Sequence, residues 1–228
     1  MKITTIKILL LGWLLITPAL ANDIYIQQSG DNLDLDIIQD GQNNVAGTSG
    51  TAMSLTGDNM TFSISQVGGG NVIEATINGA TYTGNINLTG GTNTVDLDCA
   101  TGNCDTVSMS IDVTGDSADV TVNLGSTADA SDYTGTIDIT SAATETFTLT
   151  VNAKAADADI DITNTLGSAG NTATYSQSGD GDINGHSLVH SHTGDGAVIN
   201  MSQSGIYDNK INVTTSGDNH SIDITQTD

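Results

Sequence analysis

Three histidines near the C-terminal end of the chain have the type and spacing of a transition-metal site. His186, His190 and His192 lie at alternating positions of an expected strand over residues 185–193, so their side chains should share one face. Imidazole nitrogens grouped in this way are suitable ligands for Zn²⁺ or Ni²⁺. Leu188 has the same parity, which argues against a site. We therefore interpret the histidines as part of a solvated polar face, with a metal site as the alternative.

Two cysteines form a second candidate constellation. Cys99 and Cys104 are the only cysteines and share one Gly- and Asn-containing loop. In an exported protein this predicts a disulfide that pins the loop. A metal or redox role is the alternative, because two thiolates supply half of a zinc site. The sequence has no nucleophile elbow, HExxH motif or phosphate-binding loop, and we expect no enzymatic activity.

Aspartate recurs at alternating positions beside apolar residues. If the apolar neighbours face inward, the carboxylates face outward, and stacked strands place them about 5 Å apart. Like charges at that distance repel by roughly 1 to 3 kcal/mol near a protein surface, which bound cations or raised pKa values would relieve. We expect no cofactor other than Ca²⁺ as a charge-neutralising ion. The aspartates concerned are Asp34, Asp36, Asp96, Asp98, Asp112, Asp138, Asp159, Asp161 and Asp223.

The first 21 residues have the features of a secretory signal peptide. Lys2 and Lys7 supply a positive n-region, residues 8–16 an apolar h-region, and residues 19–21 the small-x-small pattern Ala-Leu-Ala. We expect cleavage after Ala21 and a secreted, extracellular or cell-surface protein. No later stretch is apolar enough for a membrane-spanning helix, so membrane insertion is not expected.

The chain beyond residue 21 is strongly acidic. The full chain has a net charge of −23, and all 27 Asp and Glu residues follow residue 21, where Lys154 and Lys210 are the remaining basic residues. Nucleic acid and anionic membranes are therefore disfavoured as partners, because binding their phosphates requires Lys or Arg. The single proline, Pro18, precedes the cleavage site. A proline-free chain with regularly alternating Ile, Val and Leu favours stacked strands over disorder.

Short alternating segments separated by Gly- and Asn-rich corners repeat along the chain, which indicates a solenoid. Gly57, Gly68, Gly79 and Gly90 are spaced eleven residues apart, which suits a strand of about five residues plus a turn of similar length. Two such arms make a coil of about 22 residues. We therefore predict an all-β fold, a β-solenoid of about nine two-strand coils in a single domain over residues 22–228.

The phrase Gln-x-Gly-x-x-Asn marks the corners. It occurs in residues 22–98, is lost in the Asp- and Thr-rich residues 99–166, and returns in part in residues 167–228. Glycine permits the chain reversal, and inward Gln and Asn can bond to their copies one coil above and below. The predicted turn glycines are Gly41, Gly68, Gly179 and Gly205. The predicted ladder residues are Gln28, Gln39, Asn44, Gln66, Asn71, Gln177 and Gln203.

This phrase resembles the curlin repeat of the bacterial curli subunits, whose pattern is Ser/Asn-x5-Gln-x4-Asn-x5-Gln with Gly inside the turn. Residues 39–44 and 66–71 match its central part in full. Residues 177–182 and 203–208 match it with Asp in place of the last Asn, and residues 99–166 lack it. The resemblance covers about half of the chain beyond residue 21.

The resemblance implies a secreted β-solenoid that self-assembles into, or nucleates, extracellular amyloid-like fibres for adhesion or a biofilm matrix. It implies as partners further copies of the chain or other curlin-like subunits, and an outer-membrane secretion machinery. Ca²⁺ or low pH would favour folding and fibre growth by relieving carboxylate repulsion. The alternative is a monomeric cell-surface solenoid, an adhesin or a cation- or ice-binding protein, that presents rows such as Thr146, Thr148 and Thr150.

Overall fold

Every described element of the computed structural model is a β-strand. The predicted signal segment, residues 1–21, lies outside the described part of the chain. The described residues are 23–48, 50, 52–99, 106–124, 130–141, 147–153, 155–166, 171–178, 187–205 and 209–227.

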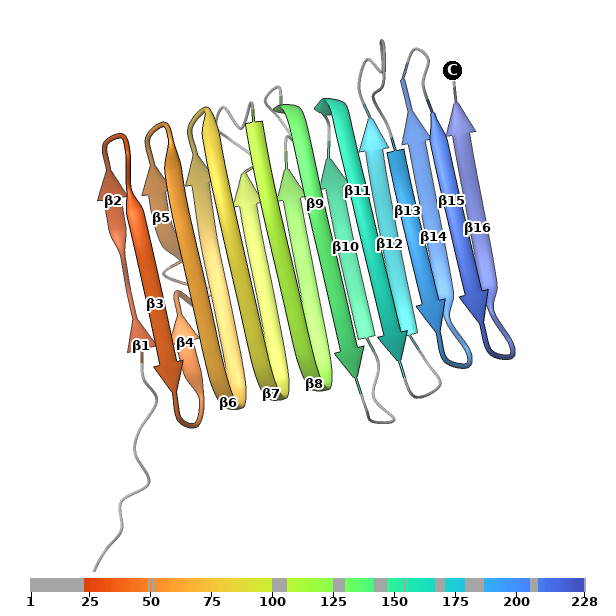
Figure 1. Cartoon of the computed structure of the whole chain (residues 1–228), viewed down its shortest axis with the longest axis horizontal. Coiled ribbons are helices and arrows are strands. Elements are labelled where there is room, and N and C mark those ends of the chain that lie inside the picture. Colours follow the sequence, from red (N-terminus) through yellow and green to blue (C-terminus); the bar gives the residue numbers. More distant parts are fainter. Residues whose placement is uncertain are drawn as a thin grey trace, which may run out of the picture.

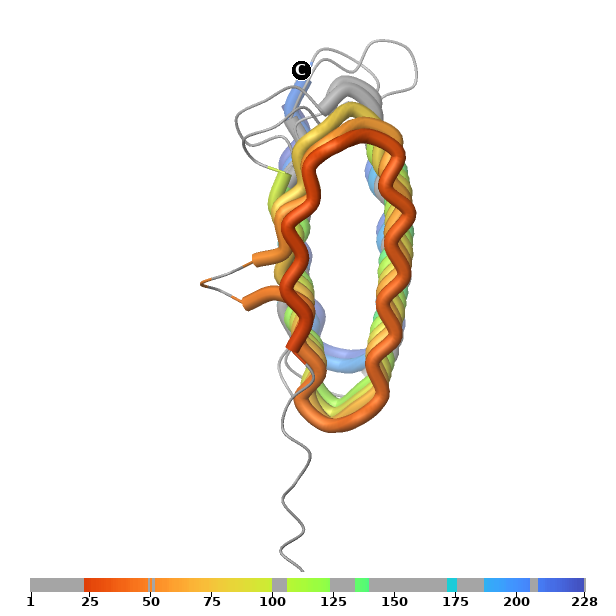
Figure 2. Tube along the Cα trace, turned by 90° about the vertical axis from the view of Figure 1, so that its left-hand side faces the viewer, coloured from red at the N-terminus to blue at the C-terminus, as the bar shows by residue number. Residues whose placement is uncertain are grey.

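The strands stack side by side (Figure 1) and form two walls that face each other, so that the chain traces a flattened ring when viewed along the stack (Figure 2). Strands β6, β7 and β8 bend at a corner and contribute their first halves to wall A and their second halves to wall B. Wall A contains, in spatial order, β3 (Asp34–Asp40), β6 (Met60–Asn78), β7 (Thr81–Cys99), β8 (Thr106–Leu124), β9 (Ala130–Ser141), β11 (Ala155–Leu166), β13 (Ser187–Thr193) and β15 (Lys210–Ser216).

Wall B begins with short strands and ends at the C-terminus. Its strands are β1 (Asp23–Ile24) with β2 (Gln27–Ser29), β4 (Asn44–Ala46) with β5 (Met53–Thr56), the second halves of β6 to β8, then β10 (Phe147–Ala153), β12 (Asn171–Ser178), β14 (Val198–Ser204) and β16 (Ser221–Thr227). Neighbouring strands pair in parallel throughout both walls. The prediction of an all-β solenoid of parallel stacked strands is confirmed, and the described residues contain no helix.

The coils differ in length, so a uniform coil of about 22 residues is not maintained. Met60 pairs with Tyr82, 22 residues later, whereas Leu35 pairs with Phe62, 27 residues later. The longer coil carries a loop between β4 and β5, around residues 47–52, that projects from wall B (Figure 2). An insertion of this kind leaves the register within the walls intact.

The alternation of apolar and polar residues decides which side chains enter the interior. In β6, Phe62, Ile64 and Ile73 are buried, while the residues beside them are partly or fully exposed. Inward residues of both walls form one continuous apolar cluster. This is the pattern expected of half-buried strands rich in β-branched residues.

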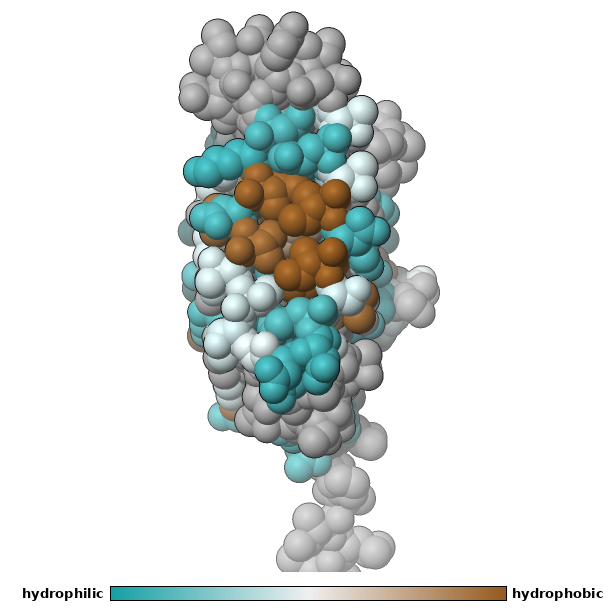
Figure 3. All heavy atoms as spheres, turned by 90° about the vertical axis from the view of Figure 1, so that its right-hand side faces the viewer, coloured by the Kyte–Doolittle hydropathy of each residue, from teal (hydrophilic) through white to brown (hydrophobic). Residues whose placement is uncertain are grey.

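The terminal coils leave part of this cluster exposed. At the C-terminal end, Ile222 and Ile224 of β16 are 42% and 45% exposed. Figure 3 views this end and shows an apolar patch bordered by polar side chains. At the other end of the described chain, Ile24 and Leu35 are only partly buried against the core.

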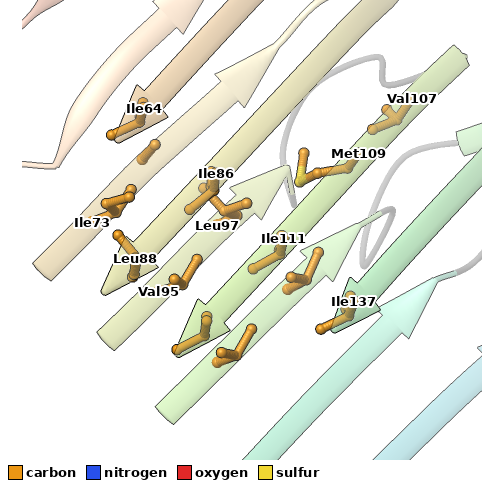
Figure 4. Close-up of a cluster of buried hydrophobic side chains, with 14 of the residues drawn as sticks. Ile64, Ile73, Ile86, Leu88, Val95, Leu97, Val107, Met109, Ile111 and Ile137 are labelled. Atoms are coloured by element: carbon orange, nitrogen blue, oxygen red, sulfur yellow. The ribbon is translucent and has the colours of Figure 1, made fainter. Parts of the chain in front are cut away.

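Large and small residues alternate along one column of the stack. Phe62 of β6 pairs in register with Gly84 of β7, and Met109 of β8 lies between Gly84 and Gly135. A Cβ atom on Gly84 would collide with the ring of Phe62, so glycine provides the space that this ring needs. Figure 4 shows Met109 among inward side chains of both walls.

Candidate functional site

An asparagine ladder lines the corner where wall A leads into wall B, called here the lower corner (bottom of Figure 2). Asn44 Nδ2 donates to Asn71 Oδ1 at 3.1 Å, and Asn71 Nδ2 donates to Asn93 Oδ1 at 2.7 Å. Asn44 and Asn71 also donate to the carbonyl oxygens of Val67 and Thr89. The side chains of all three asparagines are buried, and the bonds between coils compensate for that burial.

Glutamines form two further ladders. Gln66 Nε2 donates to Gln39 Oε1 at 2.7 Å, and Gln226 Nε2 donates to Gln203 Oε1 at 3.1 Å. The first ladder ends because the next position in register after Gln66 is Leu88. Gln177 pairs in backbone register with Gln203, and its side chain lies outside the described part.

The structure does not place Gln28 in a ladder within the chain, which corrects the prediction. Its neighbour in register is Leu55 of β5, because the loop around residues 47–52 shifts that register. Gln28 Nε2 instead donates to its own turn at Gly30 O, 2.8 Å away, and Gln28 Oε1 is buried without a hydrogen-bond partner.

The predicted turn glycines have different physical roles. Gly41 and Gly205 have φ angles of 156° and 157°, values that residues with a side chain rarely adopt. A Cβ atom on Gly68 would collide with the carbonyl oxygen of Gly41 one coil away, so the close approach of two backbones explains this glycine. Gly179 lies outside the described residues.

A second ladder type uses aspartate carboxylates at the turns. Asp31 Oδ1 accepts a hydrogen bond from the backbone N–H of Asp58 at 3.0 Å, and Asp58 Oδ1 accepts one from Ala80 at 2.7 Å. Asp195 Oδ1 accepts from the N–H of Asp218 at 2.8 Å. The recurring Gly-Asp pair in these turns was the available signal for this arrangement, which the sequence analysis missed.

The histidines occupy the interior, so their interpretation as a solvated face is wrong. His190 and His192 are 1% and 2% exposed, on the same inward side of β13 as the buried Leu188. His186 lies outside the described residues. The parity of Leu188 indicated a shared face, and that face is the core. The histidines fill space there as partly apolar rings.

The histidines form a buried column with Tyr175. Tyr175 Oη lies 3.0 Å from His190 Nδ1, and the rings of His190 and His192, and of His192 and His220, have centroids 6.1 and 5.4 Å apart. Burial first, and the nearby His192 second, lower the pKa of His190 to about 4. Burial and His220 also lower the pKa of His192. Among the described residues, no three His, Cys, Asp or Glu side chains are placed to hold a metal ion.

Cys99 ends β7 with its side chain buried and disulfide-bonded. Cys104, the other cysteine of the chain, lies outside the described residues. The Cys99–Cys104 pairing therefore stays a prediction.

Acidic side chains line the outer surface of wall B as neighbours in register. Glu74 pairs with Asp96, and burial followed by the charge of Asp96 raises the pKa of Glu74. Burial also raises the pKa of Asp96, with Asp98 and Asp119 adding to it. The loop around residues 47–52 covers a hollow of about 230 Å³ beside these groups.

Comparisons with family models, with curated proteins and with solved structures found no match for this chain. In the part of the chain that the structure describes, no helix is long and apolar enough to cross a membrane. The function is therefore inferred from the chain's own residues and geometry.

Proposed function

We propose that this chain is an exported structural protein whose copies stack end to end into extracellular, curli-like fibres for adhesion or a biofilm matrix. The observation that carries the proposal is the C-terminal coil. β15 and β16 each have a neighbouring strand on one side only among the described residues. Inward residues Ile222 and Ile224 remain nearly half exposed there. Unpaired parallel edges over an apolar surface are templates for a further strand.

The internal ladders support the same proposal. A stack held by carboxamide bonds between identical residues, such as Gln39 with Gln66, can continue into a second molecule with the same chemistry. These bonds lie in the segments that resemble the curlin repeat. The proposal includes about nine coils per copy, which the order of strands along wall B supports.

Incubating the exported chain at micromolar concentration tests the proposal. Fibres that bind thioflavin T and give a cross-β reflection near 4.8 Å are expected. Ile224→Asp should slow fibre growth more than about tenfold, because stacking would bury its charge. Thr225→Asp, on the outward side of the same strand, is the matched control and should have a much smaller effect. A chain that remains monomeric in sedimentation experiments would overturn the proposal.

The hollow beside the loop around residues 47–52 favours one alternative, a monomeric surface protein that binds cations. Glu74, Asp96 and Asp98 line it. A persistent monomer that takes up Ca²⁺ stoichiometrically in calorimetry, and loses this on Asp96→Asn, would support the alternative instead.

A further inference from the structure

The geometry points to one specific junction between two copies of this chain, which rests on the fibre proposal above. The C-terminal coil of one copy binds the first coil of the next, with β15 beside β3 on wall A and β16 beside β1 and β2 on wall B. All strands at the junction are parallel. Lys210 of one copy lies opposite Asp34 of the next.

The lower corner fixes the register. At each lower corner the last inward residue of wall A and the first inward residue of wall B are five positions apart, as in Gln66 and Asn71. The corner after β15 and the corner after β3 have the same length and shape. Asn219 and Asn43 occupy equivalent positions in these corners, with φ angles of 62° and 57°. Stacking Asn219 on Asn43 places Gly217 on Gly41.

This register has consequences along wall A that were not used to choose it. Ile211 meets Leu35 and Val213 meets Ile37, so apolar inward residues stack on apolar inward residues. Lys210 comes opposite Asp34, and both side chains are exposed on the outer surface. Lys210 is one of two basic residues beyond residue 21, so a pairing with an aspartate by chance is not trivial in the opposite sense: aspartates are common, lysines are rare, and this lysine lies on the terminal strand.

Wall B gives the same register independently. Within one copy, Ile24 pairs with Ala46, which connects the first strand to the corner after β3. Carrying the corner alignment through that pairing places Ile24 on Ile222 and Ile26 on Ile224. The two edges therefore present the same phrase, Ile-x-Ile-x-Gln, in residues 24–28 and 222–226.

The glutamines of this phrase explain an unsatisfied group. Gln28 Oε1 has no hydrogen-bond partner within its own chain, and an unpaired buried oxygen is costly. In the junction Gln28 lies beside Gln226, whose carboxamide already forms the last rung of the Gln203 ladder. The junction extends that ladder by one rung into the next molecule.

Other arrangements lose these matches. A shift by one residue would turn the inward residues of β15 and β16 outward. A shift by two residues would move Lys210 away from Asp34 and separate the glycines of the two corners. A two-fold arrangement of identical ends would close into a dimer, whereas this heterologous contact continues as an open filament.

Cysteine pairs on the outer surface test the register in the full-length chain, expressed with its own N-terminal segment and purified after export. In the junction Asn212 lies opposite Asp36, with Cβ atoms about 5 Å apart, within reach of a disulfide. Thr214 lies two residues further along the strand, about 8 Å from Asp36 and beyond disulfide geometry. Asn212→Cys with Asp36→Cys is the test pair, and Thr214→Cys with Asp36→Cys is the matched control.

Fibres of the test pair should yield, after oxidation and without reductant, a denaturing-gel ladder of covalent multimers that is at least about tenfold stronger than in the control pair. Fibres in which the control pair crosslinks better, or neither pair crosslinks, would overturn the junction and leave the fibre proposal standing. A wild-type chain that forms no fibres would overturn both. As a second measurement, Lys210→Asp should slow fibre growth several-fold, and adding Asp34→Lys should restore it.

Discussion

Replacing His190 with glutamine should remove a large part of the acid sensitivity of the C-terminal coils. Burial, and then the charge of His192, lower the pKa of His190 from 6.5 to about 4. Because the folded pKa lies below the unfolded value, the folded state favours the neutral ring. The stability that this provides is complete above pH 6.5 and is lost as the pH falls from 6.5 towards 4.

The size of the effect follows from this difference in pKa. Between pH 7 and pH 4.5, His190 alone should lower the free energy of unfolding by about 2 to 3 kcal/mol. Glutamine at this position does not titrate, and it can still accept a hydrogen bond from the hydroxyl of Tyr175, which lies 3.0 Å from His190 Nδ1. Urea unfolding followed by circular dichroism at both pH values measures the loss for the wild type and for His190→Gln.

Ser191→Gln is the matched control, because it changes the adjacent, outward-facing residue and should keep the acid dependence. Glu74, Asp96 and Asp138 act in the opposite direction. Burial raises their pKa values, so the cost of keeping them charged is relieved as the pH falls. The wild type and His190→Gln share this contribution, and it cancels in their difference. Equal losses of stability in both proteins would refute the reasoning.

Three further substitutions test the packing and the ladders through the free energy of unfolding in urea. Asn71→Ala removes the middle of the asparagine ladder and should cost about 2 kcal/mol; Thr92→Ala, on the outer surface, should cost far less, and equal costs would contradict the ladder's role. Gly84→Ala should cost about 1 to 3 kcal/mol by overpacking against Phe62, and Phe62→Leu should recover part of this; Gly69→Ala has open space and serves as control. Asp58→Ala should cost about 1 kcal/mol through the lost bond to the N–H of Ala80, whereas Asp58→Asn, which keeps an acceptor oxygen, should cost less.

Periodicity in the sequence predicted which residues share a face. The two complete Gln-x-Gly-x-x-Asn phrases placed Gln39 with Gln66 and Asn44 with Asn71, and the structure brings both pairs within hydrogen-bond distance. Asn93 escaped notice because Leu88 stands where the phrase requires glutamine. Each member of the phrase is thus an independent rung, since the Gln and Asn ladders occupy different columns.

Alternation alone did not predict which side of a strand faces the core. His190 and His192 were placed on the outside because imidazole is polar, yet Leu188 on the same side is buried. Register was equally inaccessible, because it depends on where insertions fall. Gln28 faces Leu55 as a consequence of the loop around residues 47–52, and no local pattern in either strand contains that information.

The alternation of Phe62, Gly84, Met109 and Gly135 along one column gives the stack a fixed sequence of coils. A solenoid of identical coils could slip by one whole coil and lose only its terminal contacts. Here such a slip would bring Phe62 level with Met109's position against another large side chain, or leave a gap between two glycines. The protein therefore encodes the order of its own layers through volume, independently of the hydrogen bonds that join any layer to the next.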